Sequence, residues 1–224
     1  MTNKKFIFIV GPQRTGTTYM LFLLLEHELI GNPLGRPYET TVNEKTKRRN
    51  MELLDKYDGK YVVCKNPDLF YAAKHLLNEF KDCLLIFTIR NPLEMYVSSV
   101  HMPLYNNNER DERTLTDRYV EACKSGLELI EDKRVIFVHY KDLFENPEEI
   151  LKKVLDKIEL KYDDKFIKKV VADNRFGQKI MERKRKVLFR VGQYTVDSTI
   201  SKEQQQRIKD KCWKHYEKLL KHCI

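Results

Sequence analysis

The fold of this chain is decided by the stretch FIFIVGPQRTGTT, which occupies residues 6–18. The continuous apolar run Phe6–Val10 is typical of a strand buried on both faces of a parallel sheet. Gly11 and Gly16 follow at the spacing of a phosphate-binding P-loop, in which backbone N–H groups at a helix start surround an anion. A helix predicted over Thr18–Glu28 completes the unit. The stretch therefore predicts an α/β fold with an anion site at its first turn.

The same alternation of strand and helix continues along the chain. Three further apolar runs predict buried strands at Tyr61–Cys64, Leu84–Ile89 and Val135–Val138. Helices are predicted over Leu69–Phe80, Pro92–His101, Leu115–Ile130 and Pro147–Ile158, with a last one after Ser201, and loops over Gly31–Val42, Met102–Arg113 and Arg175–Ile200. This order favours a single-domain, three-layer α/β fold over residues 1–224, with a central parallel sheet of the P-loop NTPase-like kind.

Composition restricts the class of protein. The 224 residues are 42% hydrophobic and 33% charged, which is typical of a globular chain. No apolar run approaches the ~18 residues that a membrane span needs, so we expect neither a span nor a secretory signal. Five widely spaced cysteines predict free thiols and a cytoplasmic location. The net charge of +9 favours anionic partners without choosing among them.

A second anion site is predicted at the end of the strand Leu84–Ile89. Arg90 follows this strand directly, and Ser98 lies eight residues later on the next predicted helix. Ligands of parallel sheets bind beyond the carboxyl ends of the strands, where Arg90 is placed. Together the two side chains could hold a phosphate at some distance from the P-loop.

Two departures separate this loop from that of nucleoside triphosphatases. Thr17 stands where those enzymes have Lys, and the positive charge has moved to Arg14. The third predicted strand ends in Arg90 instead of the acid that helps to hold Mg²⁺, and Asp142 lies four residues beyond Val138. We therefore expect no metal, although a P-loop kinase using ATP and Mg²⁺ remains the alternative function.

A non-catalytic nucleic-acid-binding protein is a further alternative. The run Arg183–Lys186 is basic, but no nucleic-acid motif and no interleaved aromatic residues accompany it. We therefore expect no nucleic-acid partner.

Taken in order, these motifs resemble those of sulfotransferases that use 3′-phosphoadenosine 5′-phosphosulfate (PAPS). Gly11–Thr18 resembles the 5′-phosphosulfate loop of that family, and Arg90–Ser98 resembles its 3′-phosphate motif. Val135–Leu143 is similar to its strand–Tyr-Glu-Asp-Leu–helix segment, and Phe189–Gly192 to a degenerate Arg-Lys-Gly loop that closes over the 3′-phosphate. The first loop is closer to the carbohydrate and protein-tyrosine branch than to the cytosolic aryl members.

The resemblance implies sulfuryl transfer from PAPS to a carbohydrate, a tyrosine, a small alcohol or an amine. The product would be adenosine 3′,5′-bisphosphate, and no metal would take part. The resemblance assigns catalysis to Arg14, Lys65 and Glu39. It assigns cofactor binding to Gly11, Pro12, Gln13, Arg14, Thr15, Gly16, Thr17, Thr18, Arg90, Ser98, Tyr140, Arg190 and Gly192, with Tyr140 near the adenine.

The identity of the general base is the main departure from the family pattern. Pro67 replaces the His that serves as base in cytosolic aryl and steroid members, whereas Lys65 of the same motif is kept. Glu39 occupies a place comparable to the glutamate that carbohydrate and protein-tyrosine members use. His101 and His139 are the alternatives, and His139 follows a buried strand, as a satisfied core histidine would.

Which residue of the basic segment binds the 3′-phosphate is a second open question. Arg185 and Lys186 compete with Arg190 for the 3′-phosphate, and Thr195–Asp197 replaces the Gly-Asp-Trp that often follows the Arg-Lys-Gly loop.

Overall fold

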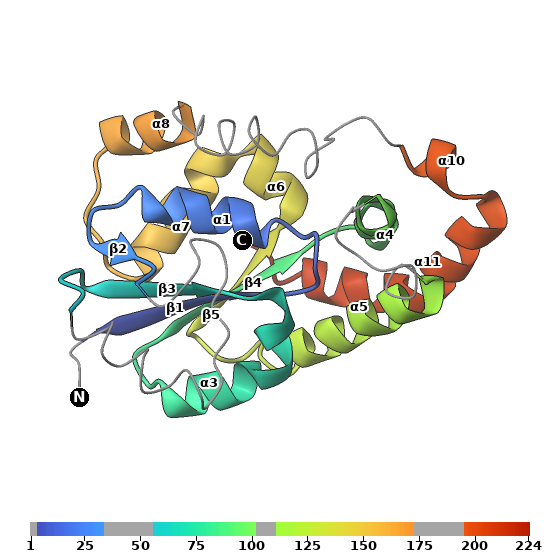
Figure 1. Ribbon diagram of the computed structural model, residues 1–224, viewed down its shortest axis with the longest axis horizontal. Helices are drawn as coiled ribbons and strands as arrows, with labels where there is room; N and C mark the ends of the chain where they lie inside the picture. Colours follow the sequence, from blue (N-terminus) through green and yellow to red (C-terminus); the bar gives the residue numbers. More distant parts are fainter. Residues whose placement is uncertain (1–3, 34–55, 102–110, 173–194) are drawn as a thin grey trace.

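The computed structural model describes residues 4–33, 56–101, 111–172 and 195–224, and its centre is a five-stranded sheet (Figure 1). The spatial order of the strands is β2-β3-β1-β4-β5, and every neighbouring pair is parallel. The strands are β1 (Lys5–Val10), β2 (Ile30–Gly31), β3 (Tyr61–Lys65), β4 (Leu84–Ile89) and β5 (Val135–His139). The predicted α/β fold with a central parallel sheet is confirmed.

The central strand β1 is apolar along its length because both of its faces are covered. Phe8 and Val10 belong to one core cluster, whereas Ile7 and Ile9 belong to the other. Successive strand side chains point to opposite faces, so one strand contributes to two cores. A continuous apolar run is thus what a strand in the middle layer requires.

Helices form the two outer layers (Figure 1). The first core cluster is covered by α3 (Ala73–Glu79), α4 (Pro92–Val100), α5 (Glu112–Leu127) and α11 (Lys202–Leu220). The second is covered by α1 (Thr17–Leu25), α6 (Tyr140–Glu145), α7 (Pro147–Lys157) and α8 (Asp164–Ala172). The short helix α10 (Val196–Thr199) lies near α4. No helix within the described ranges is both long enough and apolar enough to cross a bilayer.

Several helix boundaries differ from those predicted, mostly because a capping residue starts the helix before its first apolar residue. The helix expected over Leu69–Phe80 is a 3₁₀ helix, η1 (Pro67–Ala72), followed by α3. Asn66 caps it by accepting from the backbone N–H of Asp68, 3.1 Å away. Helix α5 begins at Glu112 because the Asp111 carboxylate accepts from the Thr114 N–H at 3.0 Å.

Four elements of the described ranges were missed altogether. Strand β2 has two residues, too few for any periodic signal, and its Ile30 and Gly31 lie in or beside the predicted loop. Helix α6 follows β5 directly without a turn residue, and α8 was not predicted. Helix α10 falls within the predicted loop Arg175–Ile200.

The strand order determines where the site lies. Strand β1 pairs with β3 on one side and with β4 on the other, and β4 pairs in turn with β5. The carboxyl ends of these four parallel strands meet at one edge of the sheet. Gly11, Lys65, Arg90 and Tyr140 stand at or directly after those ends. This edge is where open α/β sheets bind ligands.

Candidate active site

The loop between β1 and α1 depends on glycine. Gly11 has φ +131° and Gly16 has φ +95°, and Arg14 between them also has a positive φ, of 66°. A Cβ on Gly11 would lie 2.3 Å from the carbonyl oxygen of Thr88. The loop therefore runs too close to β4 for any side chain at position 11.

The hydroxyl of Thr15 belongs to the interior of this loop. Thr15 is fully buried, and its Oγ1 donates to the carbonyl of Pro12 at 2.6 Å. The same Oγ1 lies 2.6 Å from Oγ1 of Thr88. These bonds tie the loop to β4, so Thr15 shapes the loop with its side chain.

The N-terminus of α1 lies at the turn where the glycine spacing predicts an anion site. Gly16 is the N-cap and has no side chain to accept from the first N–H groups, and the first turn contains no acidic residue. The first N–H groups of a helix have no intrahelical acceptor, so they and the positive end of the helix dipole favour an anion at this end. Thr17 and Thr18 are the first two residues of the helix and bring two hydroxyls to it.

Arg90 is held on several sides at the end of β4. Its guanidinium lies over the ring of Tyr140, 3.8 Å from the ring centroid. Its Nε donates to Glu94 at 3.1 Å, and its Nη1 donates to the carbonyl of Arg14 at 3.3 Å. The hydroxyl of Tyr119 donates to the carbonyl of Arg90 at 2.6 Å. The strand-end guanidinium is therefore positioned before any ligand arrives.

The two predicted anion motifs are joined directly. Nε of Arg14, from the glycine loop, donates to Oγ of Ser98 on α4 at 3.1 Å. Together with the bond from Arg90 to the Arg14 carbonyl, this brings three site residues into one cluster. The cluster carries two guanidinium groups beside a helix N-terminus, which suits a ligand with more than one phosphate.

Lys65 reaches the same edge from β3. It is the last residue of that strand, is 3% exposed, and lies opposite Ile9 of β1 in the sheet register. The backbone continues the contact, because Asn66 N–H donates to Ile9 at 3.2 Å and Gly11 N–H donates to Pro67 at 3.3 Å. The strand that carries Lys65 is thus bonded to the start of the glycine loop.

Most of the chain matches a known family. A family model described as "Sulfotransferase domain" matches residues 4–216. The chain belongs to the sulfotransferase family. The branch within the family stays a prediction.

Solved sulfotransferases share the fold at low sequence identity. The mouse sulfotransferase SULT7A1, complexed with PAP, superposes with a TM-score of 0.66 at 14% identity, over 94% of this chain and 85% of its own. A sulfotransferase from Alicyclobacillus acidocaldarius gives 0.62 at 14%, over 97% and 96%. Sulfotransferase STF9 from Mycobacterium avium gives 0.62 at 14%, over 94% and 76%.

The candidate bases of this sulfotransferase differ in their surroundings. His139 is buried, and its Nδ1 lies 3.2 Å from Asp142 Oδ2 while its Nε2 lies 3.0 Å from the Tyr216 hydroxyl. Burial raises the pKa of Tyr216 to about 12, so its hydroxyl meets the imidazole in its neutral form. His101 is exposed, with Nε2 3.5 Å from Thr199 Oγ1. Both ring nitrogens of His139 are thus engaged in structural contacts.

The remaining predicted residues fall outside the described part of the chain. These are Glu39, Arg190 and Gly192, together with the competing Arg185 and Lys186. Their assignments stay predictions.

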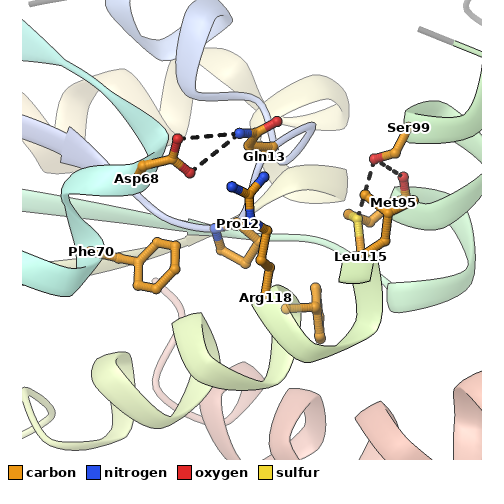
Figure 2. A pocket seen from close by; sticks show the side chains of 9 residues that line it. Pro12, Gln13, Asp68, Phe70, Met95, Ser99, Leu115 and Arg118 are labelled. Carbon is orange, nitrogen blue, oxygen red and sulfur yellow. Dashed lines mark hydrogen bonds between the residues drawn. The ribbon is translucent and has the colours of Figure 1, made fainter. Parts of the chain in front are cut away.

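Sequence reasoning missed a polar pair beside the glycine loop. Nε2 of Gln13 lies 3.2 and 3.3 Å from the two carboxylate oxygens of Asp68 (Figure 2). Asp68 follows Lys65-Asn66-Pro67 at the end of a strand, and that place was the signal that could have identified it. The pair borders a pocket beside the glycine loop. The pocket is lined by Pro12, Gln13, Asp68, Phe70, Met95, Ser99, Leu115, Arg118 and Tyr119.

Proposed function

We propose that this sulfotransferase moves the sulfuryl group of PAPS to a hydroxyl or amine, releasing adenosine 3′,5′-bisphosphate, and that residues 1–224 act as one domain. The observation that carries the proposal is the joined cluster of Arg14, Ser98 and Arg90 beside the N-terminus of α1. It offers two adjacent anion sites, as a nucleotide with separate 5′ and 3′ groups needs. The PAP bound in the mouse structure supports the same ligand class.

The glycine loop would bind the 5′ end of the donor. Its N–H groups and the hydroxyls of Thr17 and Thr18 are hydrogen-bond donors at the start of a helix. Arg14 and Lys65 supply the positive charge. As the bond from sulfur to the phosphate oxygen breaks, charge builds on that oxygen, and these fixed cations would stabilise it.

Arg90 and Ser98 would bind the 3′-phosphate, with Arg190 and Gly192 as further ligands. The guanidinium is a bidentate donor suited to phosphate, and its present partner Glu94 is half exposed and replaceable. Tyr140, whose ring lies against Arg90, would contact the adenine, as the family resemblance implies.

Glu39 would accept the proton that the acceptor loses. A hydroxyl becomes a good nucleophile as its proton is withdrawn, and the new bond from sulfur to oxygen forms on the face away from the leaving phosphate. The sulfuryl group carries less charge than a phosphoryl group, so no metal is assigned a step. The five free cysteines support a cytoplasmic location as part of this proposal.

A thermal-shift panel tests the nucleotide. Adenosine 3′,5′-bisphosphate is compared with ATP, GDP and AMP, each with and without Mg²⁺. Saturation at 100 Kd stabilises a protein by about 2.7 kcal/mol, which is about 5–10 °C for a chain of this size. We expect that shift from the bisphosphate without Mg²⁺. A shift from ATP with Mg²⁺ alone would contradict the proposal and favour the kinase alternative.

A further inference from the structure

The pocket beside the glycine loop lies where an acceptor must enter. Pro12 and Gln13 of the loop line it, whereas the next residue, Arg14, turns to Ser98 of the nucleotide cluster. A donor bound by the loop would transfer its sulfuryl group to an acceptor that lies against the loop, and adenosine 3′,5′-bisphosphate would leave. The other walls come from η1, α4 and α5, so segments that are distant in the sequence meet beside the loop.

The floor of this pocket is apolar. Phe70, Met95 and Leu115 are each less than a tenth exposed and border the space from three different elements. Such a floor holds the carbon body of an acceptor, and the ring of Phe70 offers it a flat face.

Nearly every polar group of the lining already has a partner. Ser99 donates to the carbonyl of Met95 at 2.9 Å, and the hydroxyl of Tyr119 donates to the carbonyl of Arg90 at 2.6 Å. Gln13 and Asp68 bond to each other (Figure 2). These groups are therefore occupied in holding the walls together.

Arg118 differs from the rest of the lining. Within the described ranges it makes no hydrogen bond or ion pair, and Figure 2 shows its side chain reaching from α5 toward the loop at Pro12 and Gln13. The neighbouring carboxylates are engaged elsewhere, Asp68 by Gln13 and Glu121 by the Tyr71 hydroxyl at 2.6 Å. A guanidinium beside an apolar floor is thus left with five donors for a ligand.

We propose that this pocket is the acceptor site and that Arg118 selects acceptors carrying an anionic group on an apolar body. The inference rests on the proposed function and names its substrate class, a small hydroxy acid or its amino counterpart. Arg118 is a specificity residue here. It binds the anionic end of the acceptor while the hydroxyl faces the loop, and it takes no part in bond making.

Calorimetry with two matched probes tests the inference. The protein is first saturated with adenosine 3′,5′-bisphosphate, and failure of that step counts against the proposed function itself. The complex is then titrated with 3-(4-hydroxyphenyl)propanoate and with its methyl ester, which lacks the charge. We expect the acid to bind about tenfold more tightly, an advantage that shrinks as salt is added.

Two variants of α5 separate Arg118 from a general effect of charge. Arg118→Gln should abolish the preference for the acid while leaving bisphosphate affinity unchanged. Arg113→Gln removes the same charge from the same helix, at a side chain that is 88% exposed and lies outside the pocket lining, and should keep the preference. With the bisphosphate bound, equal binding of both probes, binding of neither, or an acid preference that survives in Arg118→Gln would overturn the inference.

Discussion

At the scale of single residues, the site is prepared before its ligand binds. Arg90 is stacked on Tyr140 and bonded to Glu94 and to the backbone of Arg14, so its guanidinium has already lost its rotational freedom. A flexible arginine gives up about 2 kcal/mol of rotamer entropy when it is fixed. Because the folded protein already fixes this side chain, ligand binding does not lose that entropy again. More of the free energy of each charge-assisted bond therefore contributes to affinity.

Arg90→Ala tests the assignment of the 3′-phosphate. Hydrogen bonds to charged groups contribute about 1.5–3 kcal/mol, so affinity for adenosine 3′,5′-bisphosphate should fall about 10- to 100-fold. AMP lacks the 3′-phosphate and should lose no more than about threefold. Calorimetry on both ligands measures the difference. In the control Glu94→Gln, which keeps the guanidinium, affinity for the bisphosphate should be at least that of the native protein. Equal losses for both ligands would remove Arg90 from the 3′-phosphate.

Glu39→Gln tests the proton acceptor. The amide keeps size and hydrogen bonding but loses basicity, so kcat should fall by about 10²- to 10⁴-fold. Affinity for the bisphosphate, measured separately, should stay within about twofold because only the chemical step is affected. His101→Gln is the comparison and should lose far less. Normal turnover of Glu39→Gln would contradict the assignment and direct attention to His101 and to the carboxylate of Asp68.

At the scale of elements, the last helix holds the edge of the sheet that carries the site. Helix α11 packs against α5 and α4, and the residues after it extend along β5, where Ile224 N–H donates to Phe137 at 3.0 Å. The Tyr216 hydroxyl reaches His139, the last residue of β5, at 3.0 Å. The next residue is Tyr140, against which Arg90 is stacked. Helix α11 and the residues after it thus support the edge of the sheet at which Tyr140 and Arg90 lie.

Tyr216→Phe measures this support. It removes the hydroxyl that meets His139 Nε2 and leaves this buried ring nitrogen without its partner, so the free energy of unfolding should fall by about 1–2 kcal/mol. Urea denaturation followed by circular dichroism measures the change, with the m-value unaltered. Tyr162→Phe is the matched control, since its hydroxyl bonds to Asp156 at the surface, and should cost less than about 0.5 kcal/mol. Equal losses in the two variants would argue against a structural role for the His139 contact.

At the scale of the whole molecule, charge balance determines how a polyanionic ligand is held. The chain carries a net +9, which attracts anions from all directions, and the carboxyl edge of the sheet gathers the guanidinium groups of Arg14 and Arg90 beside a helix N-terminus. Long-range attraction speeds encounter and is screened by salt, whereas the gathered groups determine where the ligand stays.

Turnover should therefore be independent of divalent metal. In the proposed function fixed cations take the place of Mg²⁺, because Thr17 stands where nucleoside triphosphatases have Lys and Arg90 follows the strand that ends in an acid in those enzymes. We expect sulfation of an acceptor to proceed at the same rate in EDTA as in Mg²⁺. Calorimetric binding of the bisphosphate in EDTA provides a control for the state of the protein. Loss of activity in EDTA, restored by Mg²⁺, would contradict this expectation.

The sequence by itself determined those features that depend on neighbours in the chain. Apolar runs such as Phe6–Val10 predicted strands, because burial on both faces leaves no place for polar side chains. The spacing of Gly11 and Gly16 predicted the loop, because its backbone dihedrals and its approach to β4 require glycine. These are local constraints, and local patterns express them.

Only the tertiary structure decided the features that join distant segments. The bond from Arg14 to Ser98 spans 84 positions, and that from Tyr216 to His139 spans 77. Arg118 gave no signal in sequence, since one exposed-face arginine on an amphipathic helix resembles any other. The role proposed for Arg118 depends on the packing of α5 beside η1 and the glycine loop. Periodicity shows which face of an element is buried, but which elements meet there depends on the strand order of the sheet, which no local pattern records.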